Sequence, residues 1–495
     1  MNVIDTDILV VGSGAAGLMA AAAASVHGVN VIVINKGHSV NCTTWADRTY
    51  EIAGGGGCGF AAPIITPDGP EKYFEDLNRM AGSKNIPELT SLFAEKTIDV
   101  LHYLVNCGVR FKKTPDGKFL AVPEIWHSFP RILYSEHGTG KEIIRVLKKQ
   151  ALSSGVRMLE GMHAFKLLVA NGEVRGCLAF VKSIGEIICF RCKAIIIATG
   201  GAGRLFQYTT NPPGITGDGI LLAKEAGAEL INMELYSDIP MSLKPVYGLG
   251  LVPYLIFAGV DTGVEELLNS PKILWKYNPS KLSIKEFQIK FPKTFKQLQS
   301  IGFNLVKDTI ELYWMSHFML GGIRINTKAE TSIKGLYAAG EVAGGITGEG
   351  RLPGTGIAEG LVFGKIAGQN ASVYAKKIKY PKLDKATFKS SFNKTKKLSK
   401  KELQDLRQIK SVLAYRMYQA LREKKSLQVK TIAEEFESKE KEINKIFGSE
   451  YVDFIPSHSQ AEIVFEIKSA LAFGKIFLKE GASSHQGYDS CNKKY

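Results

Sequence analysis

The clearest pattern of apolar and polar positions lies near the start of the chain. An apolar run at residues 8–11 is followed by a glycine-rich segment at 12–17, an alanine-rich stretch to about residue 27, and a second apolar run at 29–34. This order predicts a buried strand, a tight turn, a helix and a second buried strand. The first 34 residues therefore read as a βαβ unit with parallel strands.

Glycine-rich segments occur at four later places in the chain. These are residues 53–59, residues 198–201 after an apolar run at 194–197, residues 214–219 before a helix expected at 220–226, and residues 340–356 before a helix expected at 357–369. Helices that begin directly after glycines present backbone N–H groups to a ligand, and phosphate binds well there. An ordinary loop is the alternative for residues 53–59.

The last quarter of the chain has a different pattern. Strong helix formers recur with helical spacing at residues 402–425, 431–447 and 459–478, which predicts a helical domain. Before it, residues 376–401 contain eleven lysines and one acid. This stretch is read as a solvated linker, with an acidic partner as the alternative.

Composition limits the class of protein. Hydrophobic residues make up 45% and charged residues 22% of the 495 residues, which excludes global disorder. The net charge of +15 comes largely from the 376–401 stretch and lacks the aromatic pattern of RNA-binding proteins, so no nucleic-acid partner is expected.

Localisation and metal content are judged from the same composition. The longest apolar run, residues 248–260, is too short to span a bilayer, and the first residues resemble no export signal. Seven scattered cysteines favour a reducing compartment, and Cys189 and Cys192 lie three apart in an expected strand, so they face opposite sides. We expect a cytoplasmic protein without its own metal or iron–sulfur cluster.

The first glycine segment has the spacing of a dinucleotide-binding turn. Gly12 would make the tight turn, Gly14 would let the backbone approach a pyrophosphate, and Gly17 would let the helix pack closely on the strand. A glycine-rich turn in an ordinary βαβ unit is the alternative. Asn35 occupies the ribose-binding position and does not distinguish NAD from FAD. The many glycine segments suit a large dinucleotide with an extended ring.

Seven motifs in order along the chain carry a family resemblance. They are VGSGAAGL, INKG, HSFPRILYSEHGTG, ATGG, TGDGILLAKEAGAEL, HFMLGGI and GLYAAGEVAGGITGEGRLPGTGIAEGLVFGKIAG. Together they resemble the flavoprotein of succinate dehydrogenase, fumarate reductase and L-aspartate oxidase over most of residues 5–370. The segment after residue 400 is similar to that family's C-terminal helical domain, more weakly.

The resemblance implies an α/β fold with a Rossmann-like FAD-binding domain, interrupted by a small α+β capping domain and followed by a helical C-terminal domain. The expected boundaries are 1–240 and 317–375 for the FAD-binding domain, 241–316 for the short capping domain, 376–401 for the basic linker and 402–495 for the helical domain.

The resemblance also implies a set of FAD contacts. The pyrophosphate would lie on Gly12, Gly14, Ala15, Ala16 and Gly17, and the adenosine side on Asn35, Lys36, Gly37, Ala164, Ala198, Thr199, Gly200 and Asp218. The flavin side would be flanked by Thr43, Thr44, Gly55, Gly56, Glu341, Gly356 and Ile357. Some relatives attach FAD through a histidine before the second glycine run. Residues 39–45 contain none, so non-covalent FAD is expected.

His317 in HFMLGG and Arg351 in GEGRLPG match the family's substrate-binding residues, and they are the expected catalytic pair. The alternatives are a core histidine and an arginine that bridges a loop. Other family positions have changed. Ile239 replaces a histidine, no arginine occurs between Arg204 and Arg324, the cap is short, and Ala482 and Gly487 replace two arginines.

Three functions remain open from the sequence. The leading one is an FAD-dependent oxidoreductase that exchanges a hydride between flavin and a small anionic organic substrate. The second is the flavin subunit of an electron-transfer complex, with an iron–sulfur partner that could also bring it to a membrane. The third is a non-catalytic relative that retains FAD. The missing cationic groups argue against fumarate, succinate or aspartate as the substrate.

Overall fold

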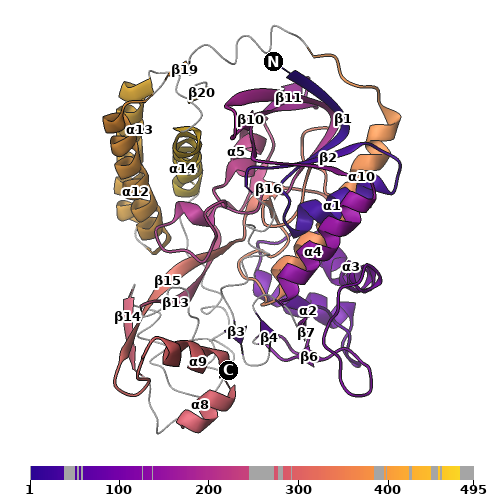
Figure 1. Cartoon of the computed structure of the whole chain (residues 1–495), viewed down its shortest axis with the longest axis vertical. Helices are drawn as coiled ribbons and strands as arrows, with labels where there is room; N and C mark the ends of the chain where they lie inside the picture. The colour runs from indigo at the N-terminus through magenta and orange to yellow at the C-terminus, as the bar shows by residue number, and fades with distance from the viewer. Residues whose placement is uncertain are drawn as a thin grey trace.

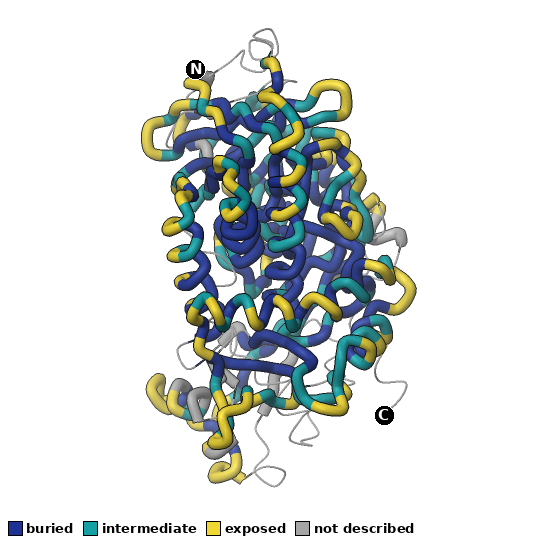
Figure 2. Tube along the Cα trace, turned by 90° about the vertical axis from the view of Figure 1, so that its right-hand side faces the viewer, coloured by how far each residue is buried: buried dark blue, intermediate teal, exposed yellow. Residues whose placement is uncertain are grey.

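The chain is an α/β protein built on one large sheet (Figure 1). The computed structural model describes residues 2–37, 51–52, 55–56, 59–124, 126–135, 138–244, 272–276, 283–290, 292–383, 395–396, 398–422, 426–447, 455–456 and 460–479. Figure 2 shows the buried residues concentrated in the interior, with exposed residues along the outer helices and turns.

The large sheet has seven strands in the order β8-β2-β1-β11-β10-β9, with β17 beside β11. Their bounds are β1 Asn2–Val11, β2 Val31–Asn35, β8 Arg157–Glu160, β9 Met162–Ala170, β10 Glu173–Val181, β11 Glu186–Ile197 and β17 Leu336–Ala338. Strands β8, β2, β1, β11 and β17 are parallel, whereas β10 and β9 pair antiparallel. The predicted βαβ unit is confirmed by β1, β2 and the helix between them.

The parallel strands end in one row. Val11 is in register with Ile34 on β2 and with Ile197 on β11, and Ile197 is in register with Ala338 on β17. The residues that follow these ends therefore leave the sheet side by side. Ligands of such sheets bind at the carboxyl edge of the strands.

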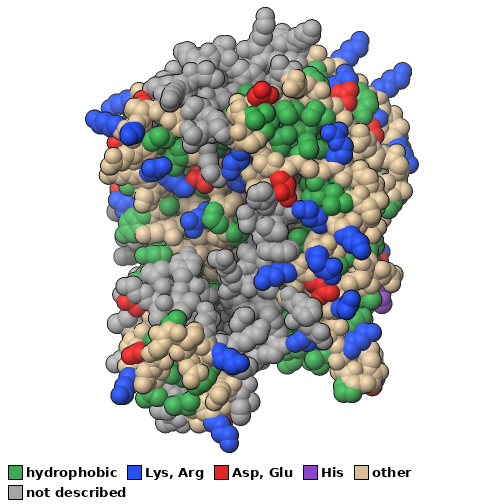
Figure 3. Space-filling model, in the orientation of Figure 1, with side chains coloured by type: hydrophobic (Ala, Val, Ile, Leu, Met, Phe, Trp, Pro, Cys, Tyr) green, Lys and Arg blue, Asp and Glu red, His purple; other side chains and the backbone are tan. Residues whose placement is uncertain are grey.

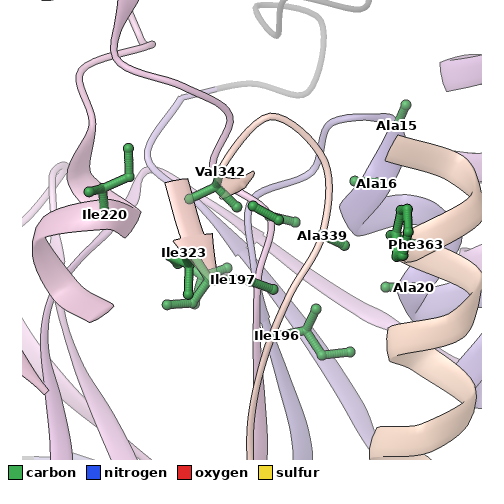
Figure 4. Close-up of a cluster of buried hydrophobic side chains, with 14 of the residues drawn as sticks. Ala15, Ala16, Ala20, Ile196, Ile197, Ile220, Ile323, Ala339, Val342 and Phe363 are labelled. Atoms are coloured by element: carbon green, nitrogen blue, oxygen red, sulfur yellow. The ribbon is translucent and has the colours of Figure 1, made fainter. Parts of the chain in front are cut away.

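Helix α1 Ala15–Ser25 packs against two other helices, α4 Thr139–Ser153 and α10 Thr355–Lys377. Helix α1 is buried from Ala15 to Ala24, because α10, α4 and the sheet surround it. Figure 4 shows alanines of α1 facing Phe363 of α10, close to isoleucines of β11.

The contact between α1 and α10 is made through small residues. A Cβ on Gly364 would lie 2.5 Å from the carbonyl oxygen of Ala16, and one on Gly368 would lie 2.2 Å from that of Ala20. Since real Cβ atoms do not come so close to an oxygen, both positions require glycine. The two helices can approach this closely only because these side chains are absent.

Smaller elements surround the core. Helices α2 Pro70–Ala81 and α3 Pro87–Asn106 pack together, and α3 also contacts α10. The remaining short elements of this part are β3 Glu51–Ile52, β4 Gly55–Gly56, β5 Phe60–Ala61, β6 Ala121–Val122, β7 Ile132–Leu133, η2 Gly203–Leu205, α5 Asp218–Glu225, β12 Leu230–Ile231, β16 Gly322–Arg324 and β18 Ala343–Gly344.

A separate three-stranded sheet carries two small helices. Its order is β13-β15-β14, and its members are β13 Tyr236–Lys244, β14 Lys272–Lys276 and β15 Thr309–Met319, with α8 Ile284–Lys290 and α9 Pro292–Ser300 nearby (Figure 1). Strands β13 and β15 run across the boundaries expected at 240 and 316. The division into domains stays a prediction.

The three helices expected near the C-terminal end are confirmed. They are α12 Lys400–Arg422, α13 Ser426–Phe447 and α14 Ala461–Lys479, which contact one another, with a short parallel pair of β19 Thr395–Lys396 and β20 Ile455–Pro456 beside them. Helix α10 extends to Lys377 and α12 begins at Lys400, so both helices enter the predicted basic linker.

Charged side chains of both signs occur on the surface. Lysine and arginine are spread over the face seen in Figure 3, with acidic residues among them. Within the described residues, no helix combines the length and apolar character that crossing a bilayer requires. Cys177, Cys189 and Cys192 are buried free thiols, and the described residues contain no His, Cys, Asp and Glu cluster suited to a metal.

The α1–α10 contact can be tested within one helix. Gly368→Ala should lower the free energy of unfolding by about 2 kcal/mol or more, because the new methyl group would meet the Ala20 carbonyl oxygen. The matched control is Gly360→Ala, whose Cβ would lie 3.6 Å from that of Ala16, an ordinary contact. It should be neutral or stabilising by up to about 1 kcal/mol.

The measurement is urea unfolding of the two variants and the unaltered protein without added ligand. Equal effects of Gly368→Ala and Gly360→Ala would contradict a backbone-close helix contact.

Candidate active site

The turn after β1 is shaped by backbone contact with the turn after β11. Gly12 has φ +110°, and a Cβ there would lie 2.2 Å from the carbonyl oxygen of Ala198. A Cβ on Gly17 would lie 1.9 Å from the carbonyl oxygen of Gly12. The backbone N–H of Ala198 donates to Val11 at 2.8 Å. Gly12 is thus required in the tight turn, as predicted, and Gly17 is required because the first turn of α1 lies against the carbonyl group of Gly12.

The start of α1 has the properties of an anion site. Its N-cap residue, Gly14, offers no side-chain cap to the first N–H groups of the helix. The hydroxyl oxygens of Ser13 and Thr199 are buried and make no hydrogen bond within the described part of the chain. Buried hydroxyls normally have partners. The Ser13 hydroxyl, next to the uncapped N-terminus of α1, fits an oxygen atom of a pyrophosphate, whereas the Thr199 hydroxyl faces Gly219 in the first turn of α5.

A partly buried ion pair lies beside the end of β2. The Lys36 ammonium, one residue beyond the ribose position Asn35, pairs with the Asp218 carboxylate at the start of α5. Lys36 Nζ also donates to the Thr216 hydroxyl at 2.5 Å, and that hydroxyl donates to Asp218 Oδ1 at 2.9 Å. Burial alone would raise the pKa of Asp218, but the charges of Lys36 and His163 lower it to about 2. Asp218 is therefore an anion at any ordinary pH.

The other end of the row is formed by the start of α10. Gly354 caps this helix with φ 76° and no side-chain cap. A Cβ on Gly356 would lie 3.0 Å from the Phe318 ring and 3.5 Å from Arg351 Nη1. Glu341 Oε1 accepts the Met319 N–H at 3.0 Å. Through these contacts the start of α10, the end of β15 and the turn after β17 lie together and form one wall of the site.

His317 and Arg351 lie within electrostatic range of each other at this wall. The Arg351 guanidinium lies over the Phe318 ring, 4.4 Å from its centroid, and Nη1 donates to the Leu352 carbonyl at 3.3 Å. His317 Nδ1 lies 2.8 Å from the Thr210 hydroxyl, and its carbonyl accepts from the Asn211 amide at 2.9 Å. Burial, and then the charge of Arg351, lower the pKa of His317 to about 3. The imidazole is thus neutral at physiological pH.

Two carboxyl groups lie within electrostatic range of Arg351. Glu359 on α10 is 2% exposed, and its Oε2 makes no hydrogen bond within the described residues. Burial raises the pKa of Glu359 to about 8 and that of Glu341 to about 7, although Arg351 lowers both. At neutral pH Glu341 and Glu359 are therefore only partly ionised, and they neutralise only part of the positive charge of Arg351.

A buried network supports the segment that carries Arg351. Arg131 is completely buried and binds both oxygens of Asp68 at 2.7 Å, with Asp76 at 2.5 Å. Its Nη1 lies 3.4 Å from Nδ1 of His127, whose Nε2 lies 2.9 Å from the Pro353 carbonyl oxygen. Because arginine only donates, Nδ1 accepts and Nε2 donates. Burial lowers the pKa of His127 to about 4, which favours this neutral form.

The structure brings most of the predicted site residues to one edge. Those placed there are Gly12, Gly14, Ala15, Ala16, Gly17, Asn35, Lys36, Gly37, Ala198, Thr199, Gly200, Asp218, His317, Glu341, Arg351, Gly356 and Ile357, with Ala164 on β9, which packs against α5. Gly55 and Gly56 form strand β4, paired with β3. Thr43 and Thr44 lie outside the described residues. The role of each residue stays a prediction.

Several residues of this edge were not predicted from the sequence. Arg131 and His127 lie in HSFPRILYSEHGTG, which carried the resemblance without a role for either residue. Glu359 is the one acid in the apolar stretch 357–364 of α10, and a lone acid there is the signal that could have identified it.

Comparison with known proteins identifies the family. The family described as FAD binding domain matches residues 7–256 and 253–357. The chain belongs to this flavoprotein family.

The relatives agree on the class of enzyme. The chain is 29% identical to a subunit of the fumarate reductase (CoM/CoB) of Methanothermobacter marburgensis, over 74% of this chain and 72% of the relative. It is 28% identical to L-aspartate oxidase of Clostridium acetobutylicum, over 74% of this chain and 88% of the relative.

Solved structures show the same fold. A chain of E. coli quinol fumarate reductase matches with TM-score 0.81 and 22% identity, over 97% of this chain and 89% of that one. A chain of Mycobacterium smegmatis Sdh1 matches with TM-score 0.81 and 22% identity, over 97% of this chain and 87% of that one.

This flavoprotein is an FAD-dependent oxidoreductase of the fumarate reductase and L-aspartate oxidase type. The uncapped start of α1 and the buried hydroxyl of Ser13 fit FAD's pyrophosphate. Non-covalent attachment stays a prediction, because residues 38–50 lie outside the described residues.

Burial of Glu359 has a measurable consequence for pH dependence. Its pKa rises from 4.5 in the unfolded chain to about 8 in the fold, so folding favours the protonated form. Its contribution to stability is complete below pH 4.5 and is lost as the pH rises to about 8. Glu359→Gln should remove much of this decline in the protein without FAD.

The measurement is the free energy of unfolding from about pH 5 to pH 8. Glu95→Gln, on the exposed side of α3, is the control and should keep the unaltered slope. A Glu359→Gln slope equal to that of the unaltered protein would show that Glu359 is charged in the fold.

Proposed function

We propose that this flavoprotein exchanges a hydride between bound FAD and a small organic anion held by Arg351 and His317. The observation that carries the proposal is that Arg351 lies beside the start of α10, within electrostatic range of His317. Arg351 contributes to the low pKa of His317, and Gly356 of α10 lies against both Phe318 and Arg351. A cation beside a helix N-terminus favours an anionic ligand.

Each side chain has a distinct part in this proposal. FAD supplies the hydride chemistry. Arg351 would bind the substrate's anionic group, and the Phe318 ring would hold the guanidinium in position. His317, neutral because of its lowered pKa, would orient the substrate by hydrogen bonding rather than by charge. Thr210 and Asn211 would fix the imidazole and its backbone.

The absent family groups narrow the substrate. The chain has no arginine between Arg204 and Arg324, so the cap region offers no second guanidinium. Ile239, at the family's histidine position, lies on β13 opposite Met315 and cannot hydrogen-bond through its side chain. A substrate bound mainly through one anionic group is therefore favoured over a dicarboxylate clamped at both ends.

Arg351→Ala should weaken binding of the anionic substrate by about 1.5–3 kcal/mol while FAD stays bound, because the variant loses one charge-assisted hydrogen bond. Arg324→Ala, at an exposed arginine on β16, is the control and should leave binding unchanged.

The measurement is anaerobic reoxidation of the dithionite-reduced flavin by candidate acceptors, starting with fumarate. Rapid reoxidation by fumarate would show that the protein handles a dicarboxylate without the cap arginine. Loss of FAD from Arg351→Ala would show that Arg351 supports the cofactor site and not the substrate.

A second candidate is a flavin subunit of a larger electron-transfer complex, since one relative is named as one subunit of a fumarate reductase. A stoichiometric iron–sulfur protein should then co-purify with the chain from its native source. Full reduction and reoxidation by small molecules, at similar rates with and without any co-purified protein, would argue against this role.

A further inference from the structure

Helix α14 places one stripe of side chains on the cofactor-binding part of the chain. Positions four residues apart lie on the same side of a helix. The stripe consists of Phe465, Ser469, Phe473 and Phe477, and all four are buried. Three members are aromatic, and Ser469 is the polar one.

The aromatic members pack on residues around the start of α5. The Phe465 ring stacks on His163, with centroids 4.3 Å apart and an interplanar angle of 24°. Phe477 meets the edge of Phe206 at 5.7 Å, and Phe473 meets it at 6.4 Å. Helix α14 is therefore held against α5 and β9 on both sides of Ser469.

Ser469 binds the carboxylate beside the ribose position. Its hydroxyl donates to Asp218 Oδ1 at 3.1 Å, and Thr216 donates to the same oxygen at 2.9 Å. The other oxygen of Asp218 receives the Lys36 ammonium. Ser469 is 3% exposed, so water cannot readily replace it as a donor.

This carboxylate lies at the adenosine end of the dinucleotide site. In a βαβ dinucleotide fold the residue at the end of the second strand faces the ribose. Asn35 ends β2, and Lys36 follows it directly and pairs with Asp218. Asp218 also begins α5, behind Gly217 in the left-handed conformation with φ 75°. A change in the direction of this carboxylate would move the charges that surround the adenosine.

We infer that Ser469 is a positioning residue for FAD: it orients the Asp218–Lys36 pair toward the adenosine half and thereby couples FAD affinity to the packing of the C-terminal helix. By linkage, if the packed position of α14 favours FAD, FAD favours the packed position of α14 to the same degree. The inference rests on FAD binding and not on the proposed substrate, so its failure would leave Arg351 and His317 unaffected.

The test compares two buried serines. Ser469→Ala removes the donor to Asp218. Ser372→Ala is the matched control, because Ser372 is fully buried on α10. Its hydroxyl donates to the backbone carbonyl of Gln369 in the same helix, at 2.7 Å. The probes are FAD and ADP, which share the adenosine and pyrophosphate, and their affinities for the apoprotein are measured by titration calorimetry.

Ser469→Ala should lower the affinity of the apoprotein for FAD and for ADP by the same factor, about tenfold. This is the effect expected for the loss of one hydrogen bond to a charged group. Ser372→Ala should change neither affinity. FAD and ADP affinities of a folded Ser469→Ala variant that equal those of the unaltered protein would overturn the inference. A loss of affinity for FAD without a loss for ADP would also overturn the inference, because the effect would then lie at the flavin end of the site.

A second measurement keeps the inference testable if Ser469→Ala fails to fold. Hydrogen exchange of the unaltered protein is compared with and without FAD. Saturating FAD should slow exchange across residues 461–479 of α14, although none of them is expected to touch the flavin ring. Equal exchange in this helix in both states would contradict the coupling.

Discussion

The close contact between α1 and α10 is the constraint on which the rest of the structure depends. Gly364 and Gly368 let the backbone of α10 approach Ala16 and Ala20 of α1. Both helices begin at the carboxyl edge of the sheet, so the contact fixes one helix N-terminus relative to the other. The predicted pyrophosphate position and the Arg351 segment are thereby held at a fixed distance from each other. No single hydrogen bond in the site could provide this, since side chains adjust more easily than packed backbones.

The two ends of the cofactor site are controlled by different electrostatic means. At the end that is predicted to hold the adenosine, Asp218 is a fixed anion because Lys36 and His163 overcome the cost of its burial. At the opposite end, burial outweighs the attraction of Arg351, and Glu341 and Glu359 have pKa values near or above neutrality. One end is thus a matched ion pair, and the other has an arginine whose neighbouring acids are only partly ionised at neutral pH. An anion is better accommodated at the second end.

The sequence predicted the backbone of this arrangement well and its side-chain network poorly. Gly12 and Gly17 were predictable because their roles depend on local spacing, and β1, α1 and β2 follow from one short pattern. Lys36, Asp218 and Ser469 come together from three distant segments, and no local periodicity predicts such a meeting. The burial of Arg131 between two aspartates is similar, because a lone arginine in sequence usually indicates surface.

The position of α10 also has a consequence for the order in which the chain can fold. Helix α1 is apolar on all sides, and its partner α10 is encoded about 330 residues later. At a synthesis rate of about 5–20 residues per second, α1 would wait on the order of tens of seconds for that partner. Strand β11 also waits for its neighbour β17, which begins about 140 residues after β11 ends. The nascent N-terminal segment therefore exposes an aggregation-prone surface during translation, and chaperone capture of that segment would be more valuable to this protein than rapid local folding.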